Sequence, residues 1–324
     1  MTKIRTVSQT GLTLITGATG FVGAGVVARL AVEGIETLAC VRRDIVSMPE
    51  GVSVVSVTDL TANSDWRQAL AGVNNLVHLA ARVHVMHDAE ADPLVAFRAV
   101  NVEGSLNLAR QAAAAGVKRF VFISSIKVNG ERTLPGRAFT EVDVPNPQDA
   151  YGQSKHEAEQ GLRQLSADTG MEVVIIRPPL VYGLGVKANF AALMRAVQCG
   201  WPLPLGAVHN QRSLVALDNM VDFIITCITH PQAANQTFLV SDGQDLSTTE
   251  LVRGMAQESG VTARLLRVPV WALHAGSSLL GKGDAVQRLC GNLQVDISKA
   301  RSLLGWVPPV SVEEGLRRAM GSGA

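Results

Sequence analysis

A tyrosine and a lysine lie four residues apart in the segment Tyr151-Gly-Gln-Ser-Lys155, at the start of a helical pattern. Side chains with this spacing lie on one face of a helix. A phenol has an unperturbed pKa of about 10 and is a poor proton carrier at neutral pH. A lysine ammonium one turn away lowers that pKa, so that Tyr151 becomes a usable acid or base. Ser125 ends an apolar run, and its hydroxyl can hold a substrate oxygen beside Tyr151.

Three glycines occur in the segment Thr16-Gly-Ala-Thr-Gly-Phe-Val-Gly23, between a short apolar run and a helical pattern. Gly17 permits a tight turn, Gly20 lets the backbone approach a pyrophosphate, and Gly23 lets the helix lie close to a sheet. The helix N-terminus adds N–H donors and the positive end of the helix dipole. This spacing in a first βαβ unit is typical of a dinucleotide site. An oxidised nicotinamide bound there would lower the pKa of Tyr151 further.

Short and almost continuously apolar runs alternate with helical patterns through the first half of the chain. Such runs, for example Arg119-Phe-Val-Phe-Ile-Ser124, are typical of a parallel sheet with helices on both faces. Right-handed crossovers then give a doubly wound (Rossmann) sheet. We therefore expect an α/β fold with strands at 12–16, 37–42, 52–57, 76–79, 119–124 and 172–177, and with helices at 22–33, 64–71, 93–115 and 150–168.

The regular alternation breaks after Pro178, where Gly and Pro become more frequent and the elements shorter. A second run of helical patterns follows Ser247. We expect a dinucleotide-binding Rossmann domain over residues 1–178 and a smaller C-terminal substrate-binding lobe formed mostly by residues 179–324, with some chain returning to the Rossmann core.

The end of the second predicted strand bears on the choice between NAD and NADP. An NAD-binding protein usually has an acidic residue there, which bonds the ribose hydroxyls of the adenosine. Here Val41 is followed by Arg42 and Arg43, and a guanidinium suits a 2′-phosphate by charge and geometry. The sequence favours NADP, with NAD as the alternative because Asp44 could neutralise one arginine. Asp59, after the third strand, could bond the adenine amino group.

The composition argues against several other classes of protein. The chain of 324 residues has 29 Lys and Arg against 28 Asp and Glu, so it lacks the excess of cations of a general nucleic-acid surface. No apolar run reaches the roughly 18 residues of a membrane span. Four separate cysteines without zinc-ligand spacing predict buried free thiols in a cytoplasmic protein. His84, His87 and Asp88 have no evident further ligand, and no metal site is expected.

Several of these motifs together resemble the extended short-chain dehydrogenase/reductase family, which is also the NAD-dependent epimerase/dehydratase family. They are the glycine segment, Asp59, Leu79-Ala80-Ala81, Asn101, Ser124-Ser125, the Tyr151/Lys155 pair and the C-terminal segment 298–308. The resemblance implies that Ser125, Tyr151 and Lys155 are catalytic and that Lys155 also holds the nicotinamide ribose. It implies cofactor contacts from Gly17, Thr19, Gly20, Phe21, Val22, Gly23, Arg42, Arg43, Asp59, Leu60, Leu79, Ala80, Ala81, Asn101, Tyr151, Lys155 and Pro178.

Two further segments, 124–131 and 177–183, are similar to those of enzymes that act on UDP-4-keto-6-deoxy-hexosamines in bacterial O-antigen synthesis. Leu180 departs from the pattern, because many nucleotide-sugar enzymes have an Asn there that touches the substrate diphosphate. Arg212 stands where relatives keep a phosphate-binding Arg. The resemblance implies substrate contacts from Ser124, Ser125, Lys127, Tyr151, Lys187, Asn189, Phe190, Arg212 and Arg288.

The hypothesis that these residues favour is a reductase. NADPH would reduce the C4 ketone of a UDP-linked 4-keto-6-deoxy-N-acetylhexosamine, giving UDP-N-acetylquinovosamine or its fucosamine epimer. The alternative is a UDP-hexose 4-epimerase with tightly held NAD. A non-catalytic dinucleotide sensor is the third reading, and the complete Ser125, Tyr151 and Lys155 set argues against it. Members of the family are often dimers, so a homodimer is an option.

Overall fold

The structure is a computed structural model that describes residues 11–42, 47–57, 59–83, 92–279 and 283–321. Its main element is a seven-stranded sheet of order β3-β2-β1-β4-β5-β6-β9, in which every neighbouring pair of strands is parallel. The α/β doubly wound sheet predicted from the apolar runs is therefore confirmed. Its strands are β1 (Leu12–Thr16), β2 (Thr37–Val41), β3 (Val52–Ser56), β4 (Val73–His78), β5 (Arg119–Ile123), β6 (Glu172–Arg177) and β9 (Thr237–Leu239).

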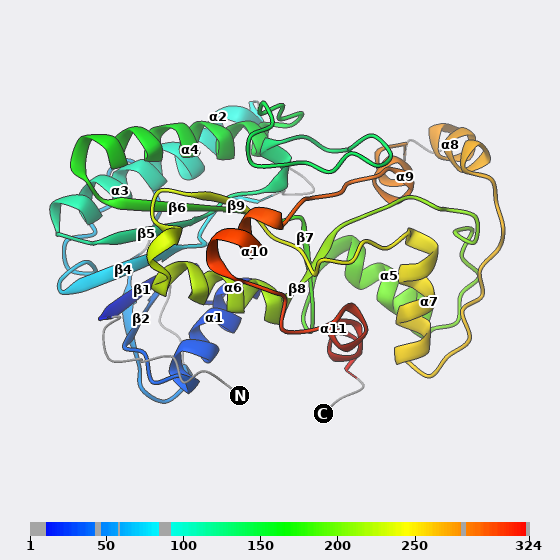
Figure 1. The fold of residues 1–324 in the computed structure, drawn as a ribbon, viewed down its shortest axis with the longest axis horizontal. Helices are drawn as coiled ribbons and strands as arrows, with labels where there is room; N and C mark the ends of the chain where they lie inside the picture. Colours follow the sequence, from blue (N-terminus) through cyan, green and yellow to red (C-terminus); the bar gives the residue numbers. More distant parts are fainter. Residues whose placement is uncertain (1–10, 43–46, 58, 84–91, 280–282, 322–324) are drawn as a thin grey trace.

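Helices cover both faces of this sheet, as Figure 1 shows. One face packs on α1 (Phe21–Val32), α6 (Leu217–Thr229) and α10 (Ser298–Leu304). The other packs on α3 (Ser105–Ala114) and α4 (Ala150–Thr169). Alternate strand residues serve the two cores, since Val121 belongs to the first and Phe120 and Phe122 to the second. This double burial is why the strands read as continuous apolar runs.

A second group of elements lies to the right of the main sheet in Figure 1 and has its own apolar core. It contains the two-stranded parallel sheet of β7 (Leu180–Tyr182) and β8 (Leu214–Ala216). Around this sheet lie α5 (Ala188–Gln198), α7 (Thr248–Glu258), α8 (Val270–Leu279), α9 (Gly283–Cys290) and α11 (Val312–Ala319). The run of helices predicted after Ser247 is present, and β9 carries the chain back to the main sheet between the two halves of this group.

Two sequence-based expectations about local structure were wrong. Residues 64–71 form turns instead of a helix, with Trp66 buried under them. The predicted helix at 93–115 divides into α2 (Pro93–Phe97), a π-helix (Arg98–Gly104) and α3. Gly104 explains the irregular turn, since a Cβ there would lie 2.7 Å from the carbonyl oxygen of Leu60 in the loop after β3. The loop and the helix therefore approach each other more closely than ordinary side chains would allow.

Two findings concern the surface and the cysteines. Across the described ranges, no helix has both the length and the apolarity of a membrane-crossing segment. Cys40 and Cys227 are buried free thiols as predicted, but Cys199 is exposed and Cys290 half-buried.

Candidate active site

The glycine segment turns tightly between β1 and α1. Gly17 has a φ of +70°, and a Cβ on it would lie 2.8 Å from the backbone nitrogen of Ala80, just after β4. A Cβ on Gly23 would lie 2.1 Å from the carbonyl oxygen of Gly17. Gly20 is the N-cap of α1, and no side chain caps this helix. The turn therefore leaves a backbone cradle at a helix N-terminus, which fits the pyrophosphate of a dinucleotide.

Replacing Gly17 by Ala is expected to weaken dinucleotide binding at least about tenfold. The added Cβ strains the backbone by about 1 kcal/mol and also collides with Ala80, at a further cost of about 1–3 kcal/mol. Gly34→Ala is the matched control, because Gly34 has a φ of +68° but no atom within 4 Å of its Cβ position. Calorimetric titration with dinucleotide and thermal unfolding of both variants check this. Equal dinucleotide affinities in the two variants would contradict the role of the cradle.

The chain leaving β4 forms the next wall of this cradle. Asn101, buried in the π-helix, accepts a hydrogen bond from the backbone N–H of Arg82 (2.8 Å) and donates to the Arg82 carbonyl (3.0 Å). It also donates to Ser154 Oγ on α4 (3.0 Å). Asn101 thus fastens the loop that contains the predicted cofactor residues Leu79, Ala80 and Ala81 to the helix that carries Tyr151. Its role in cofactor binding stays a prediction.

The remaining predicted cofactor residues surround the same edge of the sheet. Arg42 is exposed after β2, and Asp59 is exposed after β3, with its carbonyl oxygen accepting from Ser64 Oγ (2.7 Å). Arg43 lies outside the described residues. Thr19 is exposed beside the glycines, while Phe21, Val22 and Leu60 are half-buried and Pro178 is buried.

Tyr151 lies in the first turn of α4, against the chain that follows β5. The ring of Phe97 meets its ring edge-on, with centroids 6.0 Å apart. Asp149 caps the helix by accepting from Gly152 N–H (2.7 Å), and its other oxygen pairs with Lys127. Burial, and then the charge of Asp149, raises the pKa of Tyr151. The predicted lowering by Lys155 is not found in the protein alone, so any lowering of this pKa must come with the ligands.

Lys155 is buried and reaches back to β5. Its Nζ donates to the carbonyl oxygen of Ile123 (2.8 Å) and lies 4.5 Å from the centroid of the Phe122 ring. Burial lowers the pKa of Lys155 to about 7, and Glu159 one turn along opposes this shift. His78, at the end of β4, is held neutral because burial and then Lys155 lower its pKa to about 3. Lys155 is therefore a cation that titrates near neutral pH in the ligand-free site.

This lowered pKa makes a testable prediction about stability. Between pH of about 7 and 10.5 the unfolded chain binds a proton at Lys155 that the folded chain does not, so stability rises with pH in that window. The slope is at most about 1.4 kcal/mol per pH unit. In denaturant unfolding of the cofactor-free protein, the free energy of unfolding of the wild type should rise with pH by this slope relative to that of Lys155→Met. Lys118 is exposed, so Lys118→Met is the control and should keep the pH dependence of the wild type. A parallel pH dependence in wild type and Lys155→Met would contradict the shift.

Ser125 stands between two contacts that fix the chain after β5 against α4. Two residues before it, the Ile123 carbonyl holds Lys155. Two residues after it, the Lys127 carbonyl oxygen would lie 2.9 Å from a Cβ on Gly152. Ser125 begins the 3-10 helix Ile126–Val128, where its half-buried Oγ accepts from the Lys127 N–H (3.2 Å). These contacts bring Ser125 alongside the first turn of α4, as the catalytic set requires.

Ser124 belongs to a buried ion-pair network. Its Oγ donates to Glu159 Oε1 (2.6 Å), and the same carboxylate receives two hydrogen bonds from Arg177 (2.9 and 2.6 Å). Arg177 also donates to Asn129 Oδ1 (2.9 Å), and all four residues are buried. The network ties β5, α4 and β6 together at the floor of the site. The predicted substrate residue Ser124 thus has its hydroxyl turned into the protein, away from the cavity described next.

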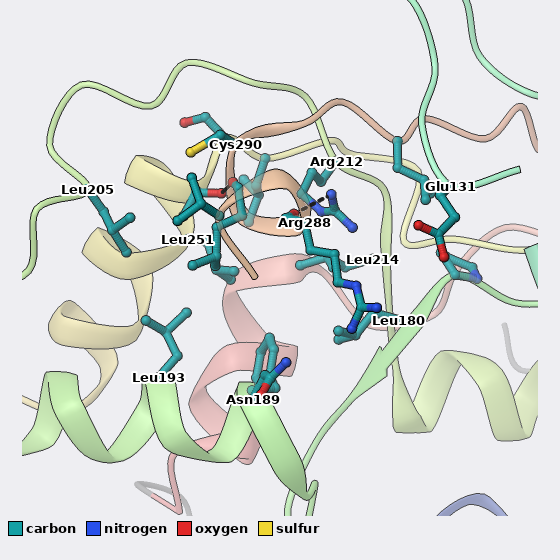
Figure 2. A pocket seen from close by; sticks show the side chains of 18 of the residues that line it. Glu131, Leu180, Asn189, Leu193, Leu205, Arg212, Leu214, Leu251, Arg288 and Cys290 are labelled. Carbon is teal, nitrogen blue, oxygen red and sulfur yellow. Dashed lines mark hydrogen bonds between the residues drawn. The ribbon is translucent and has the colours of Figure 1, made fainter. Parts of the chain in front are cut away.

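A cavity of about 670 Å³ opens from Ser125 into the second group of elements. Figure 2 shows Glu131 at one end, the side chains of Arg212 and Arg288 in the middle, and Leu193, Leu205 and Leu251 at the other end. Arg212 is bonded only to carbonyl oxygens, those of Arg288 (2.6 Å) and Gly291 (3.1 Å), in the part of the chain that the structure describes, and burial lowers its pKa. Two guanidiniums without a described carboxylate partner make the middle of the cavity an anion site.

The other predicted substrate residues divide between the cavity and its surroundings. Lys127, Asn189 and Phe190 line the cavity, and Phe190 also stacks on Tyr182 with centroids 5.6 Å apart. Lys187 is the N-cap residue of α5 and is exposed without lining the cavity. Leu180, the departure from the family pattern, also lines the cavity.

Sequence reasoning missed Glu131 and Asp149 as site residues. Both pair with Lys127, and the charge of Asp149 also acts on Tyr151. An aspartate directly before a helical pattern is an N-cap signal, which could have identified Asp149. His84, His87 and Asp88 lie outside the described residues. Among the residues that the structure describes, no cluster of three or more metal-ligating side chains occurs.

Comparisons with known proteins agree with this geometry. Residues 13–241 match the NAD dependent epimerase/dehydratase family. The chain is 51% identical over 306 residues to a Vibrio cholerae "UDP-glucose 4-epimerase", covering 94% of this chain and 93% of that protein. It is 28% identical, over 95% of this chain and 93% of that protein, to an Escherichia coli "N-acetyl-alpha-D-glucosaminyl-diphospho-ditrans,octacis-undecaprenol 4-epimerase". A Bacillus cereus UDP-glucuronic acid 4-epimerase with NAD shares the fold, with a TM-score of 0.77 at 18% identity over 96% and 97% of the chains.

These comparisons correct one prediction. The 4-reductase hypothesis was wrong in favouring a reductase over an epimerase, because the relative at 51% identity is named a 4-epimerase. The reason is that Ser125, Tyr151 and Lys155 were expected for either reaction, and Arg42 and Arg43 bear on the cofactor and not on the sugar. The matched segment covers both the glycine cradle and the Tyr151/Lys155 pair. The chain belongs to the NAD dependent epimerase/dehydratase family.

Proposed function

We propose that this protein is a 4-epimerase of a UDP-linked hexose that works with tightly held NAD. The observation that carries the proposal is the 51% identity to a protein named UDP-glucose 4-epimerase over almost the whole of both chains. The complete set of Ser125, Tyr151 and Lys155 at one edge of the sheet supports an active enzyme. The paired guanidiniums of Arg212 and Arg288 support a diphosphate in the cavity.

Each of these residues has a role in that reaction. NAD held at the glycine cradle would supply a reversible acceptor for the hydride of the sugar C4. Tyr151 takes the proton from the C4 hydroxyl and gives it back, and the Ser125 hydroxyl holds the same oxygen. Lys155 supplies the positive charge that favours the phenolate. Arg212 and Arg288 anchor the diphosphate while the sugar turns.

The proposal is tested by the products and by the absorbance of the nicotinamide. The purified protein incubated with UDP-glucose and no added dinucleotide should form UDP-galactose, with no net change in reduced nicotinamide. Continuous consumption of reduced dinucleotide without epimerised sugar would contradict it.

The cofactor is proposed to be NAD, since an epimerase regenerates its nicotinamide in every cycle and draws on no external reductant. Two solved structures of similar fold are complexes with NAD. The preference for NADP predicted from Arg42 and Arg43 stays a prediction. Denaturing the purified protein and identifying the released dinucleotide decides between them, and release of NADP would overturn the choice of NAD.

A further inference from the structure

The described wall of the cavity contains four charged side chains, those of Lys127, Arg212, Arg288 and Glu131. Glu131 is the only acidic residue of this described wall. Figure 2 shows Glu131 at the end of the cavity away from the labelled leucines, with the two arginines in between. Ser125 lies on the Glu131 side, because its Oγ accepts from the Lys127 N–H and Lys127 pairs with Glu131. A sugar diphosphate with its phosphates at the arginines would therefore turn its sugar toward Ser125 and Glu131.

Buried contacts fix the chain that carries Glu131. Two residues earlier, the buried Asn129 accepts from Arg177 at its Oδ1 (2.9 Å) and donates from its Nδ2 to the Thr140 carbonyl oxygen (2.9 Å). The Glu131 side chain is 28% exposed, and its Oε1 pairs with Lys127 Nζ (3.2 Å). Its Oε2 accepts no hydrogen bond from the described residues. Glu131 thus offers a fixed carboxylate with one unused acceptor oxygen, which a sugar hydroxyl can use.

The cations of the cavity match the charges of a diphosphate and leave none over. Arg212 and Arg288 are two guanidiniums for the two negative charges of the diphosphate. Lys127 is shared by two carboxylates, because its Nζ pairs with Asp149 as well as with Glu131. One ammonium against two carboxylates leaves a net negative charge at the sugar end. In the described wall, no cation therefore remains for a further negative charge on the sugar.

We propose that Glu131 is a specificity-determining residue that restricts the site to UDP-hexoses with an uncharged C6 and excludes UDP-hexuronates. The two kinds of sugar differ at C6, which carries a hydroxyl in a hexose and a carboxylate in a hexuronate. The hydroxyl can donate to Glu131 Oε2. A carboxylate in the same end of the cavity would be repelled by Glu131, since both are partly shielded from water. This inference rests on the proposed 4-epimerase activity and adds to it which sugars are accepted.

The first test compares three substrates on the wild-type holoenzyme. They are UDP-glucose, UDP-glucuronate and UDP-glucuronamide, whose C6 group has nearly the size of the carboxylate without its charge. The kcat/KM for epimerisation of UDP-glucuronate is expected to be at least about tenfold below that of each neutral substrate. The gap should narrow as salt is added, although all three substrates carry the same diphosphate.

The outcomes of this comparison separate the inference from the function on which it rests. A kcat/KM for UDP-glucuronate as high as that for UDP-glucose would overturn the inference and leave the proposed function standing. A kcat/KM for UDP-glucuronamide as low as that for UDP-glucuronate would also overturn it, because the discrimination would then be by shape and not by charge. Epimerisation of none of the three would overturn the proposed function itself.

A pair of variants assigns the effect to Glu131. Glu131→Gln removes the charge and keeps the length of the side chain, and should raise kcat/KM for UDP-glucuronate relative to UDP-glucose at least about tenfold. Glu33→Gln is the matched control, because Glu33 also pairs at i,i+4 spacing, with Arg29 (2.6 Å), and its side chain is 22% exposed. Glu33 follows α1 and lies outside the cavity, so this ratio should stay unchanged.

An unchanged ratio in folded Glu131→Gln, or an equal rise in both variants, would overturn the role of Glu131. If Glu131→Gln does not fold, the comparison of UDP-glucuronate with UDP-glucuronamide on the wild-type protein decides.

Discussion

Tyr151→Phe is expected to lower kcat by about 10²–10⁴-fold while dinucleotide affinity stays near that of the wild type. The ring keeps its edge-on contact with Phe97 because only the hydroxyl is lost. General acid–base catalysis accounts for an effect of this size. Steady-state epimerisation assays and calorimetric titration with NAD measure the two quantities separately. Turnover near wild type would remove Tyr151 from the proton transfer.

The chain offers a matched control, because Tyr182 is its only other tyrosine. Tyr182 is buried and donates its hydroxyl to Asp242 Oδ2 (2.8 Å). Tyr182→Phe should therefore cost about 1–3 kcal/mol of stability with little change in kcat. A loss of kcat in Tyr182→Phe as large as in Tyr151→Phe would show that the assay reports general loosening of the fold instead of proton transfer.

Glu159→Ala is expected to lower the free energy of unfolding by about 3–5 kcal/mol. The change leaves the fully buried guanidinium of Arg177 without its carboxylate and removes the acceptor of Ser124 Oγ. Breaking a buried pair by removing one partner has a cost of this size. Arg163→Ala is the control, because Arg163 also contacts Glu159 (2.9 Å) but its side chain is 43% exposed, so it should cost about 0–1 kcal/mol. Similar losses of unfolding free energy in Glu159→Ala and Arg163→Ala would contradict the larger contribution of the buried Glu159–Arg177 pair.

The same pair predicts a dependence of stability on pH. Burial raises the pKa of Glu159, but the hydrogen bonds and charge of Arg177 outweigh it, and the pKa is lowered overall. A carboxylate with a lowered folded pKa contributes stability that is present above its unfolded pKa and is lost as the pH falls through the folded value. Acid unfolding should therefore begin at higher pH in Glu159→Ala than in the wild type. Coincident acid transitions would contradict this contribution.

Local sequence patterns predicted the secondary structure correctly where the residues of one short segment determine it. The apolar runs predicted six strands of the sheet to within a few residues, since a strand buried on both faces leaves no place for polar side chains. The strand β9 was not predicted, because a strand of three residues is too short to show an apolar pattern. The prediction of a helix at residues 64–71 was wrong, because Trp66 is buried beneath turns and not on the apolar face of a helix.

Side-chain partners were harder to predict, because they come from distant parts of the chain. Ser124 was read as a substrate residue and instead bonds Glu159, 35 positions away. Asn101 was predicted as a cofactor residue, and the structure adds its hydrogen bonds to Arg82 and Ser154. The expectation that Lys155 and an oxidised nicotinamide lower the pKa of Tyr151 did not include burial and Asp149, which act in the opposite direction.

The sequence by itself determined the glycine cradle, the Tyr151/Lys155 face and the parallel sheet, because each depends on residues close together in the chain and on a fixed backbone period. Only the tertiary structure decided the cavity, where Ser125, Arg212, Arg288 and several leucines meet from segments far apart. The reason is physical: burial and charge at a site are sums over all the segments that surround it, and no local pattern records which segments those will be.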